Sequence, residues 1–360
     1  MGSSNSDAYE RAKRADAQRR KKAAALRRKR ARRVRRMKLG ILGMAAAIIV
    51  TSCIMYTIQG GKDNQTSGNF EQKQGQQTVL EAAAQIMQPE EKLKYPSVSE
   101  NYVEIVSEDI MSPYIALLDV ENGEVIAGRA YNEKIYPASM TKVMTLIVAV
   151  ENIKDLNQTY SLSYEEIDPL VRDQASRAGF DPDEEVAAKD YLYGLILPSG
   201  ADAAVALSNI VAGSEQAFAE LMNKKCEELG LKNTHFVNSS GLYDEEQYTT
   251  PVEMALIMQY AMTNETCAQV LSTYQYTTSP TDKHPDGILL TSTMFSRMYG
   301  TEVEEVTITA GKTGYTQEAG NCLVSYAQKE GRHYVALTAG ASYKWHTIFD
   351  DFEIYENYLP

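Results

Sequence analysis

Apolar residues recur along the chain with a period that changes from strand-like to helix-like and back. Segments 114–120 (YIALLDV) and 125–131 (VIAGRAY) flank Asn122-Gly123, a pattern typical of a β-hairpin. An almost entirely apolar run at 143–150 follows and predicts a helix that begins at about Ser139 and is buried on most faces. A hairpin followed by a buried helix indicates the start of a layered domain.

The rest of the chain is mainly helical in pattern from about 155 to 268 and strand-like after 304. The expected helices include AAKDYLYGLIL, ADAAVALSNIV and TPVEMALIMQYAM, and the expected strands are EEVTIT, NCLVSYAQ and HYVALTAGA. Strands at both ends with helices between them predict an α+β domain, in which an antiparallel sheet is flanked by helices and a mainly helical lobe is inserted.

The N-terminal part has a different composition. Residues 39–58 carry no charged side chain, and these 20 residues would form a helix about 30 Å long, which matches the hydrocarbon thickness of a bilayer. Residues 1–38 hold 16 Lys/Arg against 3 Asp/Glu. Because cytoplasmic flanks are enriched in Lys and Arg, we expect a single-pass anchor in a bacterial cell membrane, with a cytoplasmic N-terminus and the folded domain outside.

The N-terminal region has two alternative interpretations. Val50-Thr51-Ser52-Cys53 resembles a lipobox, which would make the chain a lipoprotein acylated at Cys53, but the apolar run continues beyond that cysteine. The 1–38 block could bind nucleic acid through its charge, yet beside an anchor its charge is better explained by topology, so no nucleic-acid partner is expected. We therefore predict a basic cytoplasmic tail at 1–38, an anchor at 39–58, a polar linker at 59–94 and a catalytic domain at 95–360.

Metal and disulfide chemistry have little support in the sequence. Outside the anchor there are three cysteines, an odd number, and neither CxxC nor HExxH spacing occurs. The four histidines are scattered. We expect buried cysteines and neither a metal nor another cofactor.

The segment YPASMTK places Ser139 and Lys142 three positions apart at the mouth of the apolar helix. Residues i and i+3 share a helix face, so both side chains point the same way. A serine hydroxyl is a weak nucleophile without a base, and a desolvated lysine with a lowered pKa can act as that base. Alternatively, Ser139 is a helix cap and Lys142 a lysine that reaches solvent.

Two further motifs follow in the order that a known superfamily shows. LPSGADAA places Ser199 at a break between two helices, and AGKTGYT contains Lys312-Thr313-Gly314. Taken singly, Lys312 could be a strand-edge charge. Together, however, the three motifs resemble those of the penicillin-recognising serine hydrolases. From about residue 95 to the end, YPASMTKVMT, LYGLILPSGADAA, NSSGLYDEEQYTT and GKTGYTQEAGNCLV are similar to the D-alanyl-D-alanine carboxypeptidases of peptidase family S11.

The resemblance implies a β-lactamase/DD-peptidase-like fold and a role for each matching residue. Ser139 would attack the penultimate D-Ala carbonyl of a peptidoglycan stem peptide ending in D-Ala-D-Ala, and Lys142 would be its base. Ser199 would relay the proton to the leaving D-alanine. Lys312 and Thr313 would bind the terminal carboxylate. The backbone N–H groups of Ser139 and Tyr315 would form the oxyanion hole, Gly314 would let the substrate backbone approach, and β-lactams would be covalent inhibitors.

One position departs from the family pattern. The second motif usually reads Ser-x-Asn, but here it is Ser199-Gly200-Ala201. The role of the missing amide is therefore in doubt, with Asn209 and Asn238 as candidates to replace it.

The motifs leave several related activities open. A β-lactamase, a transpeptidase and an endopeptidase would all use the same acyl-enzyme. A membrane-tethered penicillin- or peptidoglycan-binding module with little turnover is the alternative from a different functional class.

Overall fold

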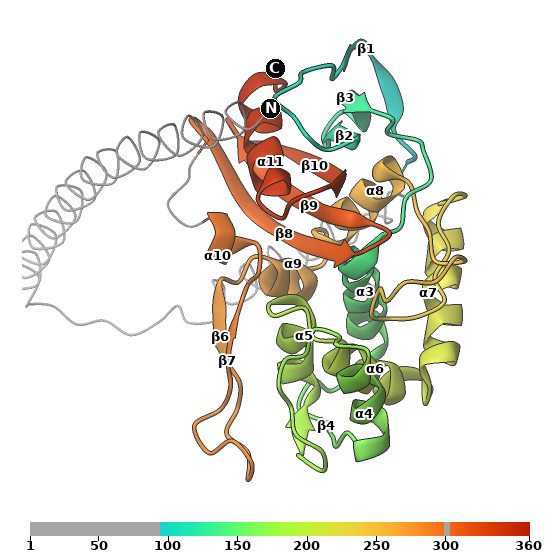
Figure 1. The fold of residues 1–360 in the computed structure, drawn as a ribbon, viewed down its shortest axis with the longest axis vertical. Helices are drawn as coiled ribbons and strands as arrows, with labels where there is room; N and C mark the ends of the chain where they lie inside the picture. The colour runs from blue at the N-terminus through green and yellow to red at the C-terminus, as the bar shows by residue number, and fades with distance from the viewer. Residues whose placement is uncertain (1–93, 299–302) are drawn as a thin grey trace, which may run out of the picture. The chain divides into compact units, whose positions relative to one another are not determined.

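A six-stranded sheet with helices on both faces forms the centre of the domain (Figure 1). The structure is a computed structural model, and it describes residues 94–298 and 303–360. The sheet order is β1-β3-β2-β10-β9-β8, so strands from the two ends of the domain lie side by side. The sheet strands are β1 (Ser97–Glu104), β2 (Tyr114–Asp119), β3 (Glu124–Arg129), β8 (Val306–Thr316), β9 (Gly320–Lys329) and β10 (Arg332–Ala341).

Between β3 and β8 the chain forms the helical lobe and two small antiparallel strand pairs, β4–β5 and β6–β7. Its elements are the 3₁₀ helix η1 (Ala138–Thr141), α3 (Lys142–Asn152), β4 (Thr159–Tyr160), α4 (Tyr164–Arg172), β5 (Val186–Ala187), α5 (Ala188–Ile196), α6 (Ala201–Ala212), α7 (Glu215–Leu229), α8 (Pro251–Ala261), α9 (Glu265–Leu271), β6 (Gln275–Thr277), β7 (Leu289–Thr291) and α10 (Phe295–Met298); α11 (His346–Asn357) follows the sheet.

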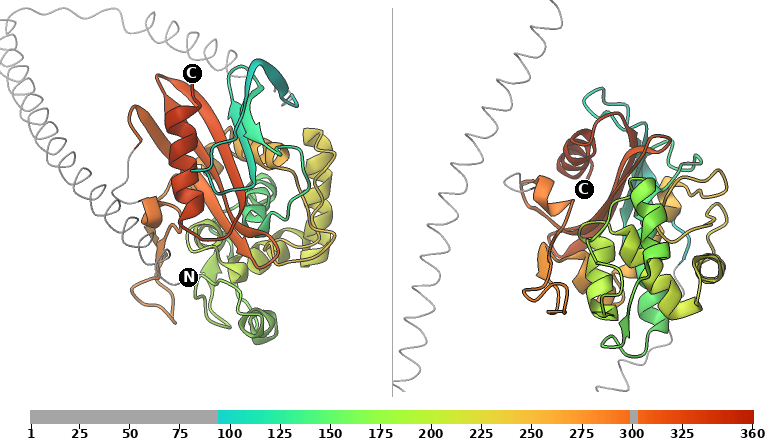
Figure 2. Two further views of the ribbon diagram at one scale, coloured as in Figure 1. Left: turned by 45° about the horizontal axis from the view of Figure 1, so that its top comes forward. Right: turned by 60° about the horizontal axis from the view of Figure 1, so that its bottom comes forward.

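The central strands are apolar on both faces because both faces are covered. On β2, Ile115 and Leu117 pack in the core under α11, whereas Ala116 and Leu118 face the larger core of the helical lobe. Successive side chains of a strand point to opposite faces, which accounts for this alternation. Figure 2 shows α11 on one side of β8–β10 and the helical lobe on the other side.

Capping signals set the helix ends that position the lobe. Ser163 and Glu166 form a capping box at α4, and Thr250 caps α8, whose first residue is Pro251. Helix α6 ends at Ala212 and is capped by Gly213, which adopts a left-handed conformation with φ of 75°. Within the lobe, α3, α5 and α6 pack against one another.

The predicted α+β arrangement is confirmed, with one correction to the sheet. Strand β1 pairs in parallel with β3, so the sheet is mixed, and only its other five strands are antiparallel. The buried helix predicted from about Ser139 begins with the one-turn η1 before the α-helix starts at Lys142.

The predicted tail, anchor and linker, including Cys53 and nearly all of 59–94, lie outside the described residues. Among the helices of the described ranges, none combines the length and the apolar character that a membrane span requires. Cys226, Cys267 and Cys322 are buried free cysteines.

Candidate active site

Ser139 and Lys142 are brought together at the junction of η1 and α3. The Lys142 Nζ donates to the Ser139 Oγ over 3.1 Å. Lys142 is only 2% exposed, although it is the first residue of its helix. The predicted nucleophile and base therefore share one face, at hydrogen-bonding distance.

The protonation of Lys142 is set mainly by burial. Desolvation lowers its pKa from 10.5 to about 7, while the carboxylates of Asp202 and Glu215 act in the opposite direction. Its ammonium also donates to the backbone carbonyl of Ser240. A lysine with this pKa is a sizeable fraction neutral near pH 7 and can accept a proton from a neighbouring hydroxyl.

The loop that supplies this carbonyl is packed directly against η1. Gly241 has φ of +80°, and a Cβ at this position would lie 1.9 Å from the Ala138 carbonyl oxygen. Only glycine combines this conformation with so close an approach. Asn238 holds the loop because its Oδ1 accepts from the Gly241 N–H over 2.7 Å.

Ser199 and Lys312 form the second pair. The Lys312 Nζ donates to the Ser199 Oγ and to the Thr313 carbonyl oxygen, each over 2.8 Å. Burial, reinforced by the positive charges of Lys142 and Arg297, holds the pKa of Lys312 well below its usual value. A negative charge that binds beside Lys312 would stabilise its protonated form.

Ser199 lies at the break between α5 and α6, as predicted, in a left-handed conformation with φ of 69°. The surrounding structure holds this break in place. Gly200 donates to the Gly194 carbonyl over 2.9 Å, and Asp202 accepts from the N–H groups of Ala178 and Gly179. Such strain persists only where neighbouring contacts fix the backbone, and it is often found at functional sites.

The Lys-Thr-Gly segment of β8 runs beside η1. A Cβ on Gly314 would lie 3.1 Å from the Pro137 carbonyl oxygen and 3.2 Å from the Ser139 nitrogen. The backbones of the third motif and of the nucleophile are therefore in close approach. Tyr315 follows directly on the strand, with a side chain that is 64% exposed.

A shallow hollow opens on the surface next to η1. It is lined by Tyr136, Pro137, Ala138, Gly241, Leu242, Tyr243, Asp244, Gln247 and Thr316. The rings of Tyr136 and Tyr243 meet edge to face, with centroids 5.1 Å apart.

Ala201 stands where the family pattern has an asparagine. Ala201 is buried as the first residue of α6, and its N–H donates to Ser176. Asn209 donates to Glu166 on α4. Asn238 contacts Lys142 only indirectly: it accepts from the Gly241 N–H in the loop whose Ser240 carbonyl accepts from Lys142.

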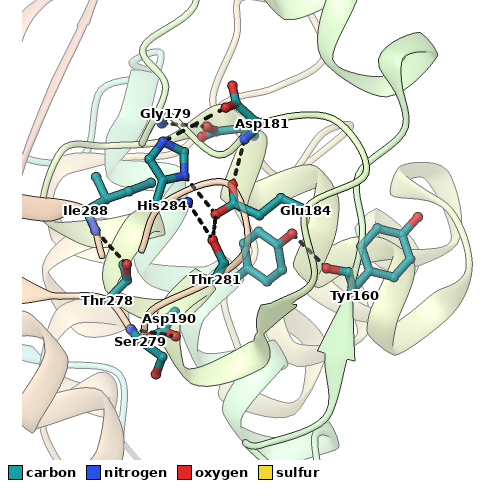
Figure 3. Close-up of polar contacts among 12 residues, drawn as sticks. Tyr160, Gly179, Asp181, Glu184, Asp190, Thr278, Ser279, Thr281, His284 and Ile288 are labelled. Atoms are coloured by element: carbon teal, nitrogen blue, oxygen red, sulfur yellow. Dashed lines mark hydrogen bonds and ion pairs between the residues drawn. The ribbon is translucent and has the colours of Figure 1, made fainter. Parts of the chain in front are cut away.

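The β6–β7 hairpin is fixed to the helical lobe by a buried carboxylate. Glu184 accepts from Thr281 and from the His284 Nδ1, the latter over 2.8 Å, and also from the Asp181 N–H (Figure 3). Burial alone would raise the pKa of Glu184, but these hydrogen bonds and the histidine lower it below 4.5. An ionised carboxylate thus anchors the far end of the hairpin, and Thr293, close to the site, follows its second strand.

Three residues of the site were missed by the sequence argument: Ser240, Asp202 and Thr293. Ser240 lies in the segment NSSGLYDEEQYTT that carries the resemblance, but it acts through its backbone carbonyl, which the residue type does not reveal. Asp202 and Thr293 act through contacts between segments that are distant in sequence. Across the described ranges, no group of three or more His, Cys, Asp or Glu residues is arranged to hold a metal ion.

The fold, together with a serine in hydrogen-bonding contact with a buried lysine, is typical of a serine acyl-transferase or hydrolase. The family model described as D-alanyl-D-alanine carboxypeptidase, Peptidase S11, matches residues 101–342. The chain belongs to this family.

Individual relatives agree with the family match. The D-alanyl-D-alanine carboxypeptidase DacF of Bacillus subtilis is 34% identical over 227 residues, which cover 63% of this chain and 56% of that protein. A D-alanyl-D-alanine carboxypeptidase of Streptomyces sp. strain K15 is 32% identical over 229 residues, covering 61% of this chain and 77% of that protein. The match thus spans little more than half the length of the Bacillus relative.

Solved structures share the fold. The crystal structure of the Streptomyces K15 DD-transpeptidase superposes with a TM-score of 0.62 at 26% identity, covering 70% of this chain and 98% of that one. A D-alanyl-D-alanine carboxypeptidase from Mycobacterium tuberculosis H37Rv gives a TM-score of 0.60 at 27% identity, covering 71% of this chain and 94% of that one.

Proposed function

We propose that this chain is a serine-type D-Ala-D-Ala carboxypeptidase that removes the terminal D-alanine of peptidoglycan stem peptides through an acyl-enzyme on Ser139. The observation that carries the proposal is the 3.1 Å contact between the Lys142 Nζ and the Ser139 Oγ, made by a buried lysine whose pKa is lowered to about 7. Family membership and the relatives named above support the same activity.

Acylation begins when neutral Lys142 accepts the hydroxyl proton of Ser139. The Ser139 Oγ attacks the penultimate D-Ala carbonyl, and the developing oxyanion accepts from the backbone N–H groups of Ser139 and Tyr315. The C–N bond then breaks, and the leaving D-alanine takes a proton through Ser199, whose hydroxyl is held by Lys312. Water attacks the ester in the second half-reaction and regenerates Ser139.

The substrate's terminal carboxylate binds beside Lys312 and Thr313. Burial and the nearby positive charges of Lys142 and Arg297 hold the pKa of Lys312 well below its usual value, so they disfavour its protonated form. A carboxylate supplies a negative charge and strengthens the protonated form, so binding of an anionic peptide end is favoured. A β-lactam carries a similar carboxylate next to a strained amide and would acylate Ser139 in the same way.

A non-hydrolytic binding module is the second candidate, and Ala201 favours it. Without the family amide, the acyl-enzyme could form and then be deacylated slowly. Such a protein would bind β-lactams or stem peptides covalently with little turnover.

Location at the membrane forms a further part of the proposal. Residues 39–58 are uncharged and follow a strongly basic block, which supports a single-pass anchor with the catalytic domain outside the cell. We expect the full chain to require detergent for extraction from membranes. Deletion of residues 1–58 should abolish that requirement, and a deleted chain that still needs detergent would contradict the anchor.

The enzymatic proposal is tested by D-alanine release from a diacyl-Lys-D-Ala-D-Ala peptide, with the full chain and Ser139→Ala compared. Steady release by the wild type and none by Ser139→Ala is the expected result. Penicillin labelling of Ser139 without release would favour the binding module. Transfer of the acyl group to an added amino acceptor would indicate transpeptidation. If the protein shows no release and no labelling, both the carboxypeptidase and the binding module are excluded.

A further inference from the structure

Thr293 connects the hairpin to two of the three motifs. It lies between β7 and α10, and its N–H donates to the Leu197 carbonyl over 3.0 Å, two residues before Ser199. Its Oγ1 lies 2.7 Å from the Oγ1 of Thr313 in the Lys-Thr-Gly segment. None of the three sequence motifs contains this residue.

Together with the backbone, these contacts form a ring of hydrogen bonds that links Ser199, the Lys-Thr-Gly segment and Thr293. Lys312 joins Ser199 to the Thr313 backbone through two hydrogen bonds. Thr293 joins the Thr313 side chain back to the end of α5, which leads into Ser199. Thr313 is 6% exposed, so its hydroxyl has few alternative partners.

In the contact between the Thr293 and Thr313 hydroxyls, one hydroxyl must be the donor and the other the acceptor. Only one hydrogen can lie between the Thr293 and Thr313 oxygens. If Thr313 donates it, its remaining lone pairs face an incoming carboxylate and repel it. If Thr293 donates it, the Thr313 hydrogen is free to donate to that carboxylate, and the donor chain is polarised toward the anion.

We propose that Thr293 is a positioning residue for recognition of the substrate's terminal carboxylate. It donates to Thr313 and thereby directs the Thr313 hydroxyl hydrogen toward the anion. The inference rests on the proposed carboxypeptidase function and adds a specificity-determining residue to it. Lys312 provides the charge, and Thr293 sets the orientation of the hydroxyl beside it.

The alternative is that Thr293 only fixes the hairpin against β8. Loss of its side chain would then impair all substrates equally. A pair of substrates that differ only in the carboxylate separates the two roles: an acyl-D-Ala thioester with a carboxymethyl leaving group, and its methyl ester.

The test compares Thr293→Val, Thr293→Ser and wild type on this substrate pair, with the full chain. Thr293→Val should lose about tenfold in kcat/KM on the carboxylate substrate, the effect of losing one hydrogen bond to a charged group. It should change kcat/KM on the methyl ester by less than about twofold, within the range of an uncharged contact. Thr293→Ser keeps the hydroxyl and should restore the preference for the carboxylate.

Thr291→Val is the matched control, because Thr291 lies two residues earlier in the same hairpin and its hydroxyl accepts from Gln275. This control should leave both substrates unaffected. Equal losses of Thr293→Val on the two substrates, or no loss on either, would overturn the inference. Wild-type protein that turns over neither substrate would overturn the proposed function itself, a result distinguishable from the other two.

Discussion

Lys142 combines burial with contacts that fix its ammonium. Its pKa of about 7 follows from desolvation, which outweighs the carboxylates of Asp202 and Glu215. The side chain is also held by Ser139 and the Ser240 carbonyl, so its geometry does not depend on charge alone. A base in this state should work best when it is neutral.

The pH dependence of acylation should therefore report Lys142. We expect kcat/KM for D-alanine release to rise with pH through a midpoint of about 7, because the neutral base is populated above its pKa. The Lys142→Arg variant keeps a cation but no accessible neutral form, and it should be inactive. A flat profile from pH 5.5 to 8.5, or an active Lys142→Arg variant, would contradict this assignment.

The same pKa shift affects stability with a defined sign. The folded-state pKa lies below the unfolded value of 10.5, so between about 7 and 10.5 the unfolded chain binds more protons. The contribution of Lys142 to stability therefore rises with pH in that window.

At the residue scale, the motifs predicted which side chains would lie together, while the catalytic roles of these side chains stay a prediction. Ser139, Lys142, Ser199 and Lys312 lie in two hydrogen-bonded pairs, as a joint role requires. The partner of Lys142 could not be predicted in this way. Ser240 contributes a carbonyl oxygen, which every residue possesses, and its position depends on the fold of a distant loop.

At the scale of elements, the approach of the 238–241 loop to η1 is the tightest constraint at the site. Gly241→Ala combines a left-handed backbone with a Cβ 1.9 Å from a carbonyl oxygen, so η1 must shift. We expect a loss of Ser139 acylation of at least about a hundredfold, since small misplacements of reacting groups have effects of this size. The rate of penicillin acylation measures it.

Gly331→Ala is the control that separates the effect of backbone strain from the effect of a steric clash between the new Cβ and η1. Gly331 has φ of +84°, but a Cβ there would meet nothing within 4 Å. This variant should lose about 1 kcal/mol of stability, the cost of a left-handed conformation, and keep its acylation rate. Equal acylation rates for the two variants would show that the contact with η1 is unimportant.

The carboxylate of Glu184 should stabilise the hairpin only when it is ionised. Its pKa is lowered in the folded state, so the stabilisation is present above the unfolded pKa of about 4.5 and is lost as pH falls through the folded value. Glu184→Gln should lower the free energy of unfolding by about 2 kcal/mol at pH 7, and by much less near pH 3. Thermal unfolding at both pH values tests this, and an equal difference at both would contradict it.

Element types were predictable where apolar periodicity was strong. Strand β2 is buried over 115–119 and α3 over 142–149, and both were identified from their apolar runs. Helix α11 was missed because Asp350 and Asp351 interrupt its pattern. Both are buried, with Asp350 accepting from Ser112 and Asp351 from Ser325. Partners so distant in sequence leave no local signal.

Strand β1 was missed for a different reason. Its segment SVSENYVE is mostly exposed, so it lacks the apolar pattern of a buried strand. It joins the edge of the sheet by parallel pairing with β3. This pairing depends on the neighbouring strand already being in place, and local propensity does not encode it.

At the scale of the whole molecule, strands from both ends of the domain form one sheet, and the catalytic groups gather where β8 meets η1 and the α5–α6 break. Three motifs, whose ends Ser139 and Gly314 are 175 positions apart in the sequence, are thereby brought to one site. The order of motifs indicated this convergence, and the family match supports it.

The most direct test of the account is to locate the acyl group during turnover. The full chain is mixed with diacyl-Lys-D-Ala-D-Ala, quenched in acid within its first turnovers, and mapped by mass spectrometry beside Ser139→Ala. The account predicts a diacyl-Lys-D-Ala ester on Ser139 that is lost in the variant and accompanied by one D-alanine released. An acyl group on another residue, or D-alanine released by Ser139→Ala at the wild-type rate, would contradict it.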